Sequence, residues 1–179
     1  KWLDFTKQED SEKIKNILED IKLEAFALVK TACKIINNKE FNLPDGKKII
    51  WSMIPYDVQL VWGLAIHAWN ISEMKTWEWK TLVATLPAYL NALTWNTVQI
   101  VTVNDYLAQR DSSEMSILYS TLWLTTWVIY NSQDKTEKAN AYKCDIVYAT
   151  NNEFAFDYLR DHMVIKNEER SDSKVFFAI

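Results

Sequence analysis

The chain contains very little glycine. Only Gly46 and Gly63 occur in its 179 residues, whereas an average usage of about 7% would give roughly a dozen. Glycine is the usual residue where the backbone must turn tightly or adopt a left-handed conformation. Tryptophan is abundant instead, with nine copies. The shortage of one residue and the excess of the other are similar in size, and the tryptophans stand where a permissive backbone is expected.

Cysteine and histidine are also scarce, which argues against a metal centre. Cys33 and Cys144 are isolated and lack metal-ligand spacing, so we interpret them as reduced, mostly buried thiols. His67 and His162 have no Cys, Asp or Glu at metal spacing. We therefore expect structural or exposed roles for both histidines.

The chain has no long apolar run and no basic excess. No uninterrupted stretch of 18 apolar residues occurs, so we expect no membrane-spanning helix. The first residues lack the pattern of a signal peptide. The net charge of −4 gives no basic footprint for nonspecific nucleic-acid binding. Together these features indicate a soluble protein in a reducing compartment.

Apolar periodicity predicts helices and strands in alternation. Helical spacing covers 11–36, 55–68, 80–93, 106–119 and 154–163, and strand-like runs cover 98–103, 125–130, 145–149 and 174–179. We expect a surface hairpin or loop over 37–46, a polar connection over 131–139 and a solvated loop over 167–174. Strands that alternate with helices predict an α/β fold with a parallel sheet.

One segment has the spacing of a phosphate-binding loop. It reads Met74-Lys75-Thr76-Trp77-Glu78-Trp79-Lys80-Thr81, and with glycine at 77 and 79 it becomes M-K-T-G-E-G-K-T, a nucleotide-binding signature. We expect a strand to lead into this loop and a helix to begin near Lys80. Such a loop points backbone N–H groups at phosphates, where the helix N-terminus adds positive charge. Lys80 would meet the β- and γ-phosphates and Thr81 would offer its hydroxyl to Mg²⁺. Tryptophan at 77 and 79 would crowd the phosphates.

Around this loop the chain resembles the first nucleotide-binding domain of SecA, the ATPase motor of bacterial protein export. The match runs from about residue 24 to the end and contains long consecutive blocks. They include D-V-Q-L at 57–60, T-L-V-A-T-L-P-A-Y-L-N-A-L-T at 81–94, V-T-V-N-D-Y-L-A-Q-R-D at 101–111 and T-N-N-E-F-A-F-D-Y-L-R-D at 150–161. A single phosphate-loop motif would not justify the assignment, but these blocks together do.

The resemblance implies a RecA-like parallel sheet with flanking helices, of the P-loop NTPase type found in helicase superfamily two. It divides the chain into an N-terminal helical segment and loop, 1–50, and a partial nucleotide-binding domain, 51–179. The implied ligands are ATP and Mg²⁺, bound by the loop residues 77–81, with Mg²⁺ on Thr81. Gln59 would read the adenine edge and Arg110 would lie near the nucleotide.

The resemblance also implies partners and a location for the whole protein. They are the SecYEG channel, secretory preproteins and an anionic lipid surface, with a homodimer as a further option and no nucleic acid. The location is cytoplasmic and peripheral at the cell membrane. The acidic Walker B residues of the family would follow Ile179. We therefore expect a fragment that holds no catalytic residue and does not turn over ATP alone.

The chain departs from the family at seven positions where the family has glycine. These are Trp62, Trp69, Trp77, Trp79, Trp95, Trp123 and Trp127. Some bacterial lineages read the codon UGA as glycine, so a translation that reads UGA as tryptophan would produce this pattern. Genuine tryptophans in a decayed paralogue are the alternative. Trp51 matches a tryptophan in one branch of the family, and Trp2 stays undecided.

Two other functions remain open. A nucleic-acid helicase of the same superfamily would share the nucleotide motifs, but the acidic balance and the 150–161 block disfavour it. A non-catalytic remnant would follow if the tryptophans are genuine. Within the 150–161 block, Asn151, Asn152 and Arg160 match residues that couple nucleotide state to the rest of the motor, although loop and helix capping explains them equally.

Overall fold

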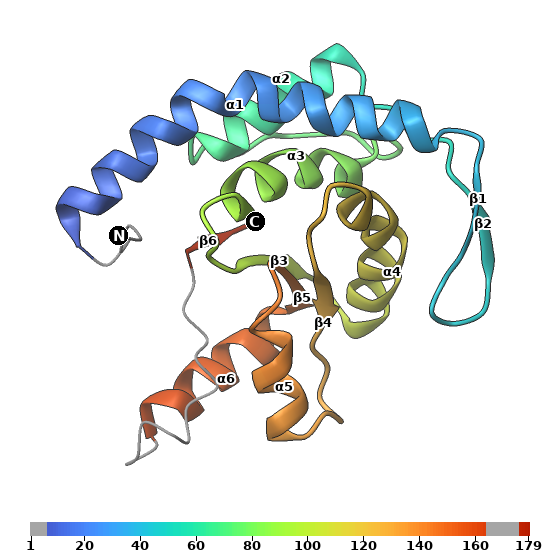
Figure 1. The fold of residues 1–179 in the computed structure, drawn as a ribbon. Helices are drawn as coiled ribbons and strands as arrows, with labels where there is room; N and C mark the ends of the chain where they lie inside the picture. Colours follow the sequence, from blue (N-terminus) through green and yellow to red (C-terminus); the bar gives the residue numbers. More distant parts are fainter. Residues whose placement is uncertain (1–6, 164–175) are drawn as a thin grey trace.

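The computed structural model describes residues 7–163 and 176–179, which form an α/β fold (Figure 1). The main sheet has four strands in the order β4-β5-β3-β6. Their bounds are Thr126–Val128 (β4), Ile146–Thr150 (β5), Val98–Thr102 (β3) and Phe177–Ala178 (β6). All three pairings are parallel, which confirms the predicted RecA-like α/β architecture.

Strands β3 and β5 form the centre of the sheet. They pair over five residues, with Ile100 opposite Tyr148. All five residues of β5 are buried. A near-continuous apolar, β-branched run is typical of a parallel strand with both faces covered. The strands predicted at 98–103 and 145–149 correspond to β3 and β5.

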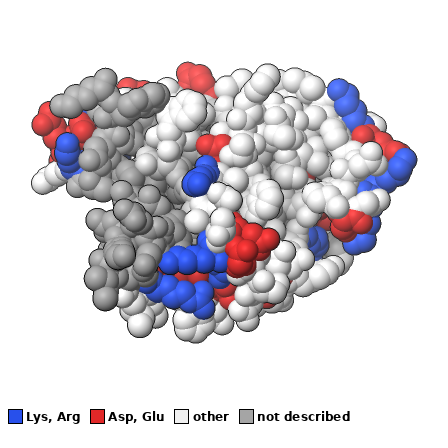
Figure 2. Space-filling view, turned by 60° about the horizontal axis from the view of Figure 1, so that its bottom comes forward, with Lys and Arg blue, Asp and Glu red and all other residues white. Residues whose placement is uncertain are grey.

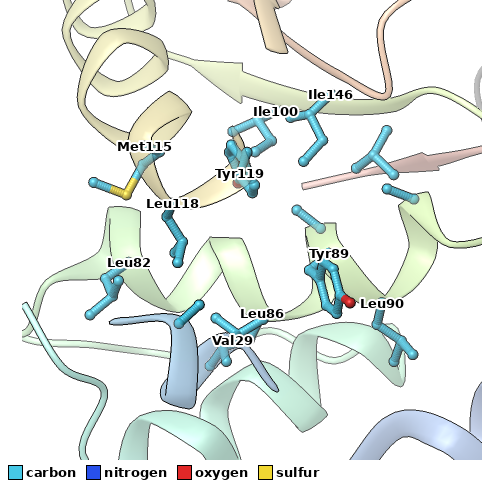
Figure 3. Close-up of a cluster of buried hydrophobic side chains, with 14 of the residues drawn as sticks. Val29, Leu82, Leu86, Tyr89, Leu90, Ile100, Met115, Leu118, Tyr119 and Ile146 are labelled. Carbon is cyan, nitrogen blue, oxygen red and sulfur yellow. The ribbon is translucent and has the colours of Figure 1, made fainter. Parts of the chain in front are cut away.

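Helix α3 (Lys80–Ala92) lies at the centre of the hydrophobic core. Figure 3 shows Leu82, Leu86, Tyr89 and Leu90 of α3 between Val29 of the long helix α1 (Gln8–Ile36) and the sheet with α4 (Asp105–Thr121). Ten of the thirteen residues of α3 are buried, including Pro87 inside the helix. Burial on nearly every side means that α3 cannot shift without disturbing several elements.

Helix α2 (Asp57–His67) packs against α3 at a point of close approach. A Cβ added at Gly63 would lie 3.0 Å from side-chain atoms of Leu86 and Phe26. That distance is shorter than an ordinary carbon contact. Gly63 is therefore required by packing rather than by its backbone conformation.

A two-stranded ribbon extends from the body after α1 (Figure 1). Strands β1 (Glu40–Asn42) and β2 (Lys48–Ile50) are antiparallel, and Gly46 in their turn has φ +82°. The expectation of a surface hairpin over 37–46 is confirmed.

Several other expectations are confirmed and two are wrong. The helices predicted at 11–36, 55–68, 80–93 and 106–119 correspond to α1 to α4, and the helix at 154–163 to α6 (Asn151–Met163). The polar stretch 131–139 contains the start of helix α5 (Lys135–Ala141), which Asp134 and Glu137 initiate as a capping box. The strand expected to lead into the phosphate loop is absent, because residues 71–75 have no regular structure. The expected loop 167–174 lies outside the described residues.

Helices α5 and α6 are joined by a buried ion network. Lys138 Nζ lies 2.6 Å from Glu153 Oε2 and 3.1 Å from Asp157 Oδ1, and the Tyr142 hydroxyl donates to Asp157 Oδ2. Charge burial of this kind is tolerated only when each ion is paired. Figure 2 shows the molecule with the bottom of Figure 1 turned forward. Most of this face is uncharged, and Lys or Arg atoms lie beside Asp or Glu atoms in its lower part.

Candidate functional site

The predicted phosphate loop has the backbone of a glycine loop. Trp77 has φ +74° and Trp79 has φ +49°, both in the left-handed region, where residues with a Cβ are uncommon. Trp79 is the N-cap of α3, and no side chain caps that end. Leu82 N–H already donates to Trp79 O and Glu78 N–H to Lys75 O. The amides at the very start of α3, those of Lys80 and Thr81, are the ones that suit an anion, because the first amides of a helix have no partner within it.

The two indoles of the loop have different surroundings. The Trp77 side chain is 90% exposed, so the expectation that both indoles crowd the phosphate site is wrong for Trp77. The Trp79 ring stacks on Tyr56, with centroids 5.7 Å apart and planes at 17°. Lys80 begins α3 and is exposed. The loop therefore has an accessible lysine beside the unsatisfied helix end.

Gln59 is attached to the loop. It is 1% exposed; its Oε1 accepts from the Tyr56 amide and its Nε2 donates to the Glu78 carbonyl, both at 2.8 Å. These bonds join the N-terminus of α2 to the middle of the phosphate loop. The side chain expected to read adenine thus also fixes the position of the loop.

Thr81 and Arg110 meet at a single carboxylate. The Thr81 hydroxyl donates to Asp111 Oδ2 at 3.2 Å, and Arg110 donates to Asp111 Oδ1 through Nε at 2.8 Å and an Nη at 2.6 Å. Partial burial opposes the charge on Arg110, but the bond to Asp111 outweighs it and raises the pKa of the guanidinium. The sequence analysis missed Asp111, because an aspartate after a helical arginine has no distinctive pattern.

The fold thus brings the predicted site residues into one continuous set. Gln59 contacts Glu78, residues 77–81 are consecutive, and Thr81 is linked through Asp111 to Arg110. The donors come from α2, the loop with α3, and α4. The set carries two exposed cationic side chains, Lys80 and Arg110, beside the helix N-terminus, as a polyphosphate site requires.

Three other tryptophans occupy the ends of helices in the same left-handed conformation. Trp69, Trp95 and Trp123 have φ of +61°, +62° and +63°. The Trp69 N–H donates to Ile66 O, and the N–H of the following residue, Asn70, donates to Ala65 O. The same pair of bonds recurs at Trp123, where the acceptors are Ser120 O and, for the following residue, Tyr119 O. This pair of bonds defines the Schellman motif, whose left-handed residue is usually glycine.

The other tryptophans among the described residues, Trp51, Trp62 and Trp127, are not left-handed. Trp62 lies inside α2 and Trp127 inside β4, so the expectation that all seven positions fall at turns or close approaches is wrong for these two. Trp51 is 0% exposed and its indole N–H donates to Met53 O at 2.6 Å. Its burial agrees with the interpretation of Trp51 as a true tryptophan. Trp2 lies outside the described residues.

The described residues, 7–163 and 176–179, contain no group of three His, Cys, Asp or Glu side chains that could hold a metal ion. Both cysteines are free thiols, and burial raises the pKa of Cys33 to about 12. His67 is buried. Its Nδ1 is hydrogen-bonded to the side-chain amide of Asn91, and its Nε2 lies 3.6 Å from Glu19 Oε1. Any Mg²⁺ here would have to be shared with a bound phosphate, as it usually is.

In the 150–161 block, the structure gives a side-chain contact for one of the three residues singled out, Arg160. Asn151 and Asn152 begin α6, and Arg160 pairs with Asp157 at 3.1 Å. Lys138, which the sequence analysis did not single out, holds Asp157 from α5. Its carboxylate partners are 15 and 19 residues away in the chain, so no local pattern indicated them.

Among the helices that the structure describes, none has the length and apolar character that a membrane span requires.

Comparison with known proteins identifies the family of the chain. A family model described as the SecA DEAD-like domain matches residues 2–179. The chain is 48% identical over 177 residues to the protein translocase subunit SecA of Pelodictyon phaeoclathratiforme, and 48% identical to that of Prosthecochloris aestuarii. Each alignment covers 99% of the chain but 17% of the relative, so the chain spans about a sixth of their length. By this match the chain belongs to the SecA DEAD-like domain family.

Proposed function

We propose that this chain binds the phosphates of ATP with Mg²⁺, as part of an ATP-driven motor that moves preproteins through the SecYEG channel. The observation that carries the proposal is the left-handed backbone at 77 and 79 directly before the uncapped N-terminus of α3. That geometry places successive amides and a helix dipole at one point. Lys80 and Thr81 follow it immediately.

Each site residue has a role in this proposal. The Lys80 ammonium offsets phosphate charge, and the Thr81 hydroxyl offers lone pairs to Mg²⁺. Bound Mg²⁺ supplies charge neutralisation that the protein lacks. Gln59 is 1% exposed and both ends of its carboxamide are bonded to the backbone around the loop, so it would read the adenine edge only after turning out of this position. Arg110 approaches the phosphates from α4.

We also infer that the natural protein carries glycine at 69, 77, 79, 95 and 123. A non-glycine residue held in the left-handed region costs about 1–2 kcal/mol, and Trp77 and Trp123, which are 90% and 94% exposed, bury too little surface to offset that cost. Glycine removes the cost and leaves the amides of the loop open to a ligand. For Trp62 and Trp127 the proposal rests on the codon hypothesis alone.

The remaining proposals concern the protein at its natural length. The two relatives named above are called protein translocase subunits. On that basis we propose secretory preproteins, the SecYEG channel and an anionic lipid surface as partners, a homodimer as an assembly, and a cytoplasmic protein at the membrane periphery. Stimulation of ATP hydrolysis by preprotein with channel supports this; stimulation by RNA alone contradicts it.

The direct test is nucleotide binding. We expect Trp77→Gly with Trp79→Gly to tighten ADP binding on the order of 100-fold over the unchanged chain, measured by calorimetry with Mg²⁺ at the natural length. Lys80→Ala in the glycine background should then weaken binding on the order of tenfold or more, because a charge-assisted bond to phosphate is lost.

Matched controls identify the cause of the change. Trp95→Gly and Trp123→Gly make the same substitution at left-handed positions outside the loop and should leave affinity unchanged. Reading the seven codons tests the glycine assignment independently. The proposed site would be contradicted if the protein with glycine at 77 and 79 did not bind ADP, or if Lys80→Ala did not change its ADP affinity.

A further inference from the structure

Asp111 stands between the two elements that would hold Mg²⁺ and phosphate. Its side chain is 12% exposed, and its two oxygens have separate partners. Oδ2 accepts the Thr81 hydroxyl from the first turn of α3, and Oδ1 accepts both donors of Arg110 on α4. One carboxylate therefore fixes both side chains relative to each other.

The direction of the Thr81 bond has a chemical consequence. A hydroxyl has one hydrogen and two lone pairs. In this structure the hydrogen is given to Asp111, so both lone pairs remain for a cation. A hydroxyl without this acceptor could turn its hydrogen toward the cation, which would oppose coordination.

The Arg110 bonds explain how a carboxylate can stand beside an anion site. An unpaired aspartate there would repel phosphate, because like charges a few ångströms apart in a partly buried site interact strongly. Two short donors from Arg110 neutralise it. The Arg110–Asp111 pair is neutral as a whole, so the net positive charge offered to a ligand is that of Lys80 and the helix end, with Arg110 beside them as a hydrogen-bond donor.

We propose that Asp111 is a positioning residue for nucleotide binding, which orients the Thr81 hydroxyl toward Mg²⁺ and holds Arg110 at the phosphate site. The inference rests on the proposed function. It assigns Asp111 no contact with the nucleotide. Its effect should therefore be seen in the part of the affinity that depends on Mg²⁺, which a purely structural aspartate would not change selectively.

The experiment measures ADP affinity with Mg²⁺ and with EDTA, in the protein at its natural length with glycine at 77 and 79. We expect Asp111→Asn to reduce the tightening caused by Mg²⁺ about tenfold, since one oxygen of the charged acceptor becomes an NH₂ donor and Thr81 and Arg110 cannot both keep their bonds. Thr81→Val should cause a similar loss. The double variant should be little worse than Thr81→Val, because both changes remove one interaction.

Further variants separate positioning from folding. Thr81→Ser retains the hydroxyl and should restore most of the Mg²⁺ effect. Asp20→Asn makes the same change on the exposed face of α1 and should leave it intact. A thermal midpoint without ligand shows whether each variant is folded; if Asp111→Asn does not fold, the Thr81→Val and Thr81→Ser pair tests the same bond.

Three outcomes are distinguishable. The proposal is supported if Asp111→Asn reduces the tightening of ADP binding by Mg²⁺ and the double variant with Thr81→Val is little worse than Thr81→Val alone. Normal Mg²⁺ dependence in Asp111→Asn, or full additivity with Thr81→Val, overturns it and leaves the proposed function standing. Failure of the glycine-loop protein to bind ADP under either condition overturns both.

Discussion

Trp51 and the tryptophans that follow helices have the same side chain and opposite surroundings. Trp51 is fully buried, and its indole N–H has a carbonyl partner. Trp69, Trp95 and Trp123 hold exposed rings on left-handed backbone. At Trp51 the fold buries the indole; at the helix ends the rings stay largely exposed, although that of Trp69 contacts Phe177 edge-on with centroids 5.0 Å apart. A residue of which only the backbone conformation is used is one that glycine replaces at a gain.

The largest expected effect comes from removing the left-handed tryptophans. Replacing Trp69, Trp77, Trp79, Trp95 and Trp123 by glycine should raise the free energy of unfolding by about 3–5 kcal/mol. Each site loses a left-handed penalty of about 1–2 kcal/mol and gives back about 0.5–1 kcal/mol of backbone entropy. Urea denaturation of both forms measures the difference.

The same substitution has matched controls in regular structure. Trp62→Gly in α2 and Trp127→Gly in β4 should each lower stability by about 0.5–1 kcal/mol or more. Because the exposed rings do not overpack the core, left-handed strain is the cause that this comparison isolates. A five-site glycine form that is no more stable than the tryptophan form would show that these tryptophans are native.

Replacing the buried Trp51 should lower the free energy of unfolding, the opposite of the effect expected at the left-handed tryptophans. Trp51→Phe should lower the free energy of unfolding by about 2 kcal/mol, because it leaves a small cavity and an unpaired Met53 carbonyl. Trp95→Phe makes the same change at an exposed ring and should stay within about 0.5 kcal/mol of the starting chain. Equal effects at the two positions would mean that Trp51 is not part of the core.

A smaller effect on stability should come from the titration of His67, which lies two residues before Trp69. Burial lowers the pKa of His67 below its ordinary 6.5, with Lys22 acting in the same direction and Glu19 against it. The unfolded chain therefore binds more protons than the folded one below about pH 6.5. Stability should fall as pH decreases through that range and recover as pH rises.

Two histidine variants isolate this dependence. His67→Gln should flatten the fall in urea midpoint between pH 7 and pH 5. His162→Gln, at an exposed residue of α6, should leave the fall in place. The assignment to His67 is wrong if the slope survives in His67→Gln and disappears in His162→Gln.

The smallest expected effect is optical. Iodide should quench most of the native fluorescence, because four of the five left-handed rings are exposed. Trp51→Phe should lower the unquenchable fraction, whereas Trp95→Phe should lower the quenchable one. Stern–Volmer plots of the three chains measure this, and an unchanged unquenchable fraction in Trp51→Phe would contradict the burial of Trp51.

Much of the fold could be predicted from sequence, because local patterns specify it. The β-branched run at 98–103 and the apolar spacing at 80–93 gave β3 and α3 with nearly correct ends. The missed helix α5 depends on a capping box, Asp134 with Glu137, which is short and polar. The strand expected at 71–74 failed for a different reason. A strand requires a hydrogen-bonded neighbour, and none of the described strands pairs with this segment.

The candidate site divides in the same way. The sequence by itself determined the loop 74–81, Lys80 and Thr81 as its anion-binding and Mg²⁺-binding candidates, and the family, because these depend on consecutive residues. Only the tertiary structure placed Asp111 against Thr81 and Gln59 against Glu78, since packing of α2 and α4 around α3 sets those distances. The structure likewise separated five left-handed tryptophans from Trp62 and Trp127, because the sign of φ depends on where each helix ends in the folded chain.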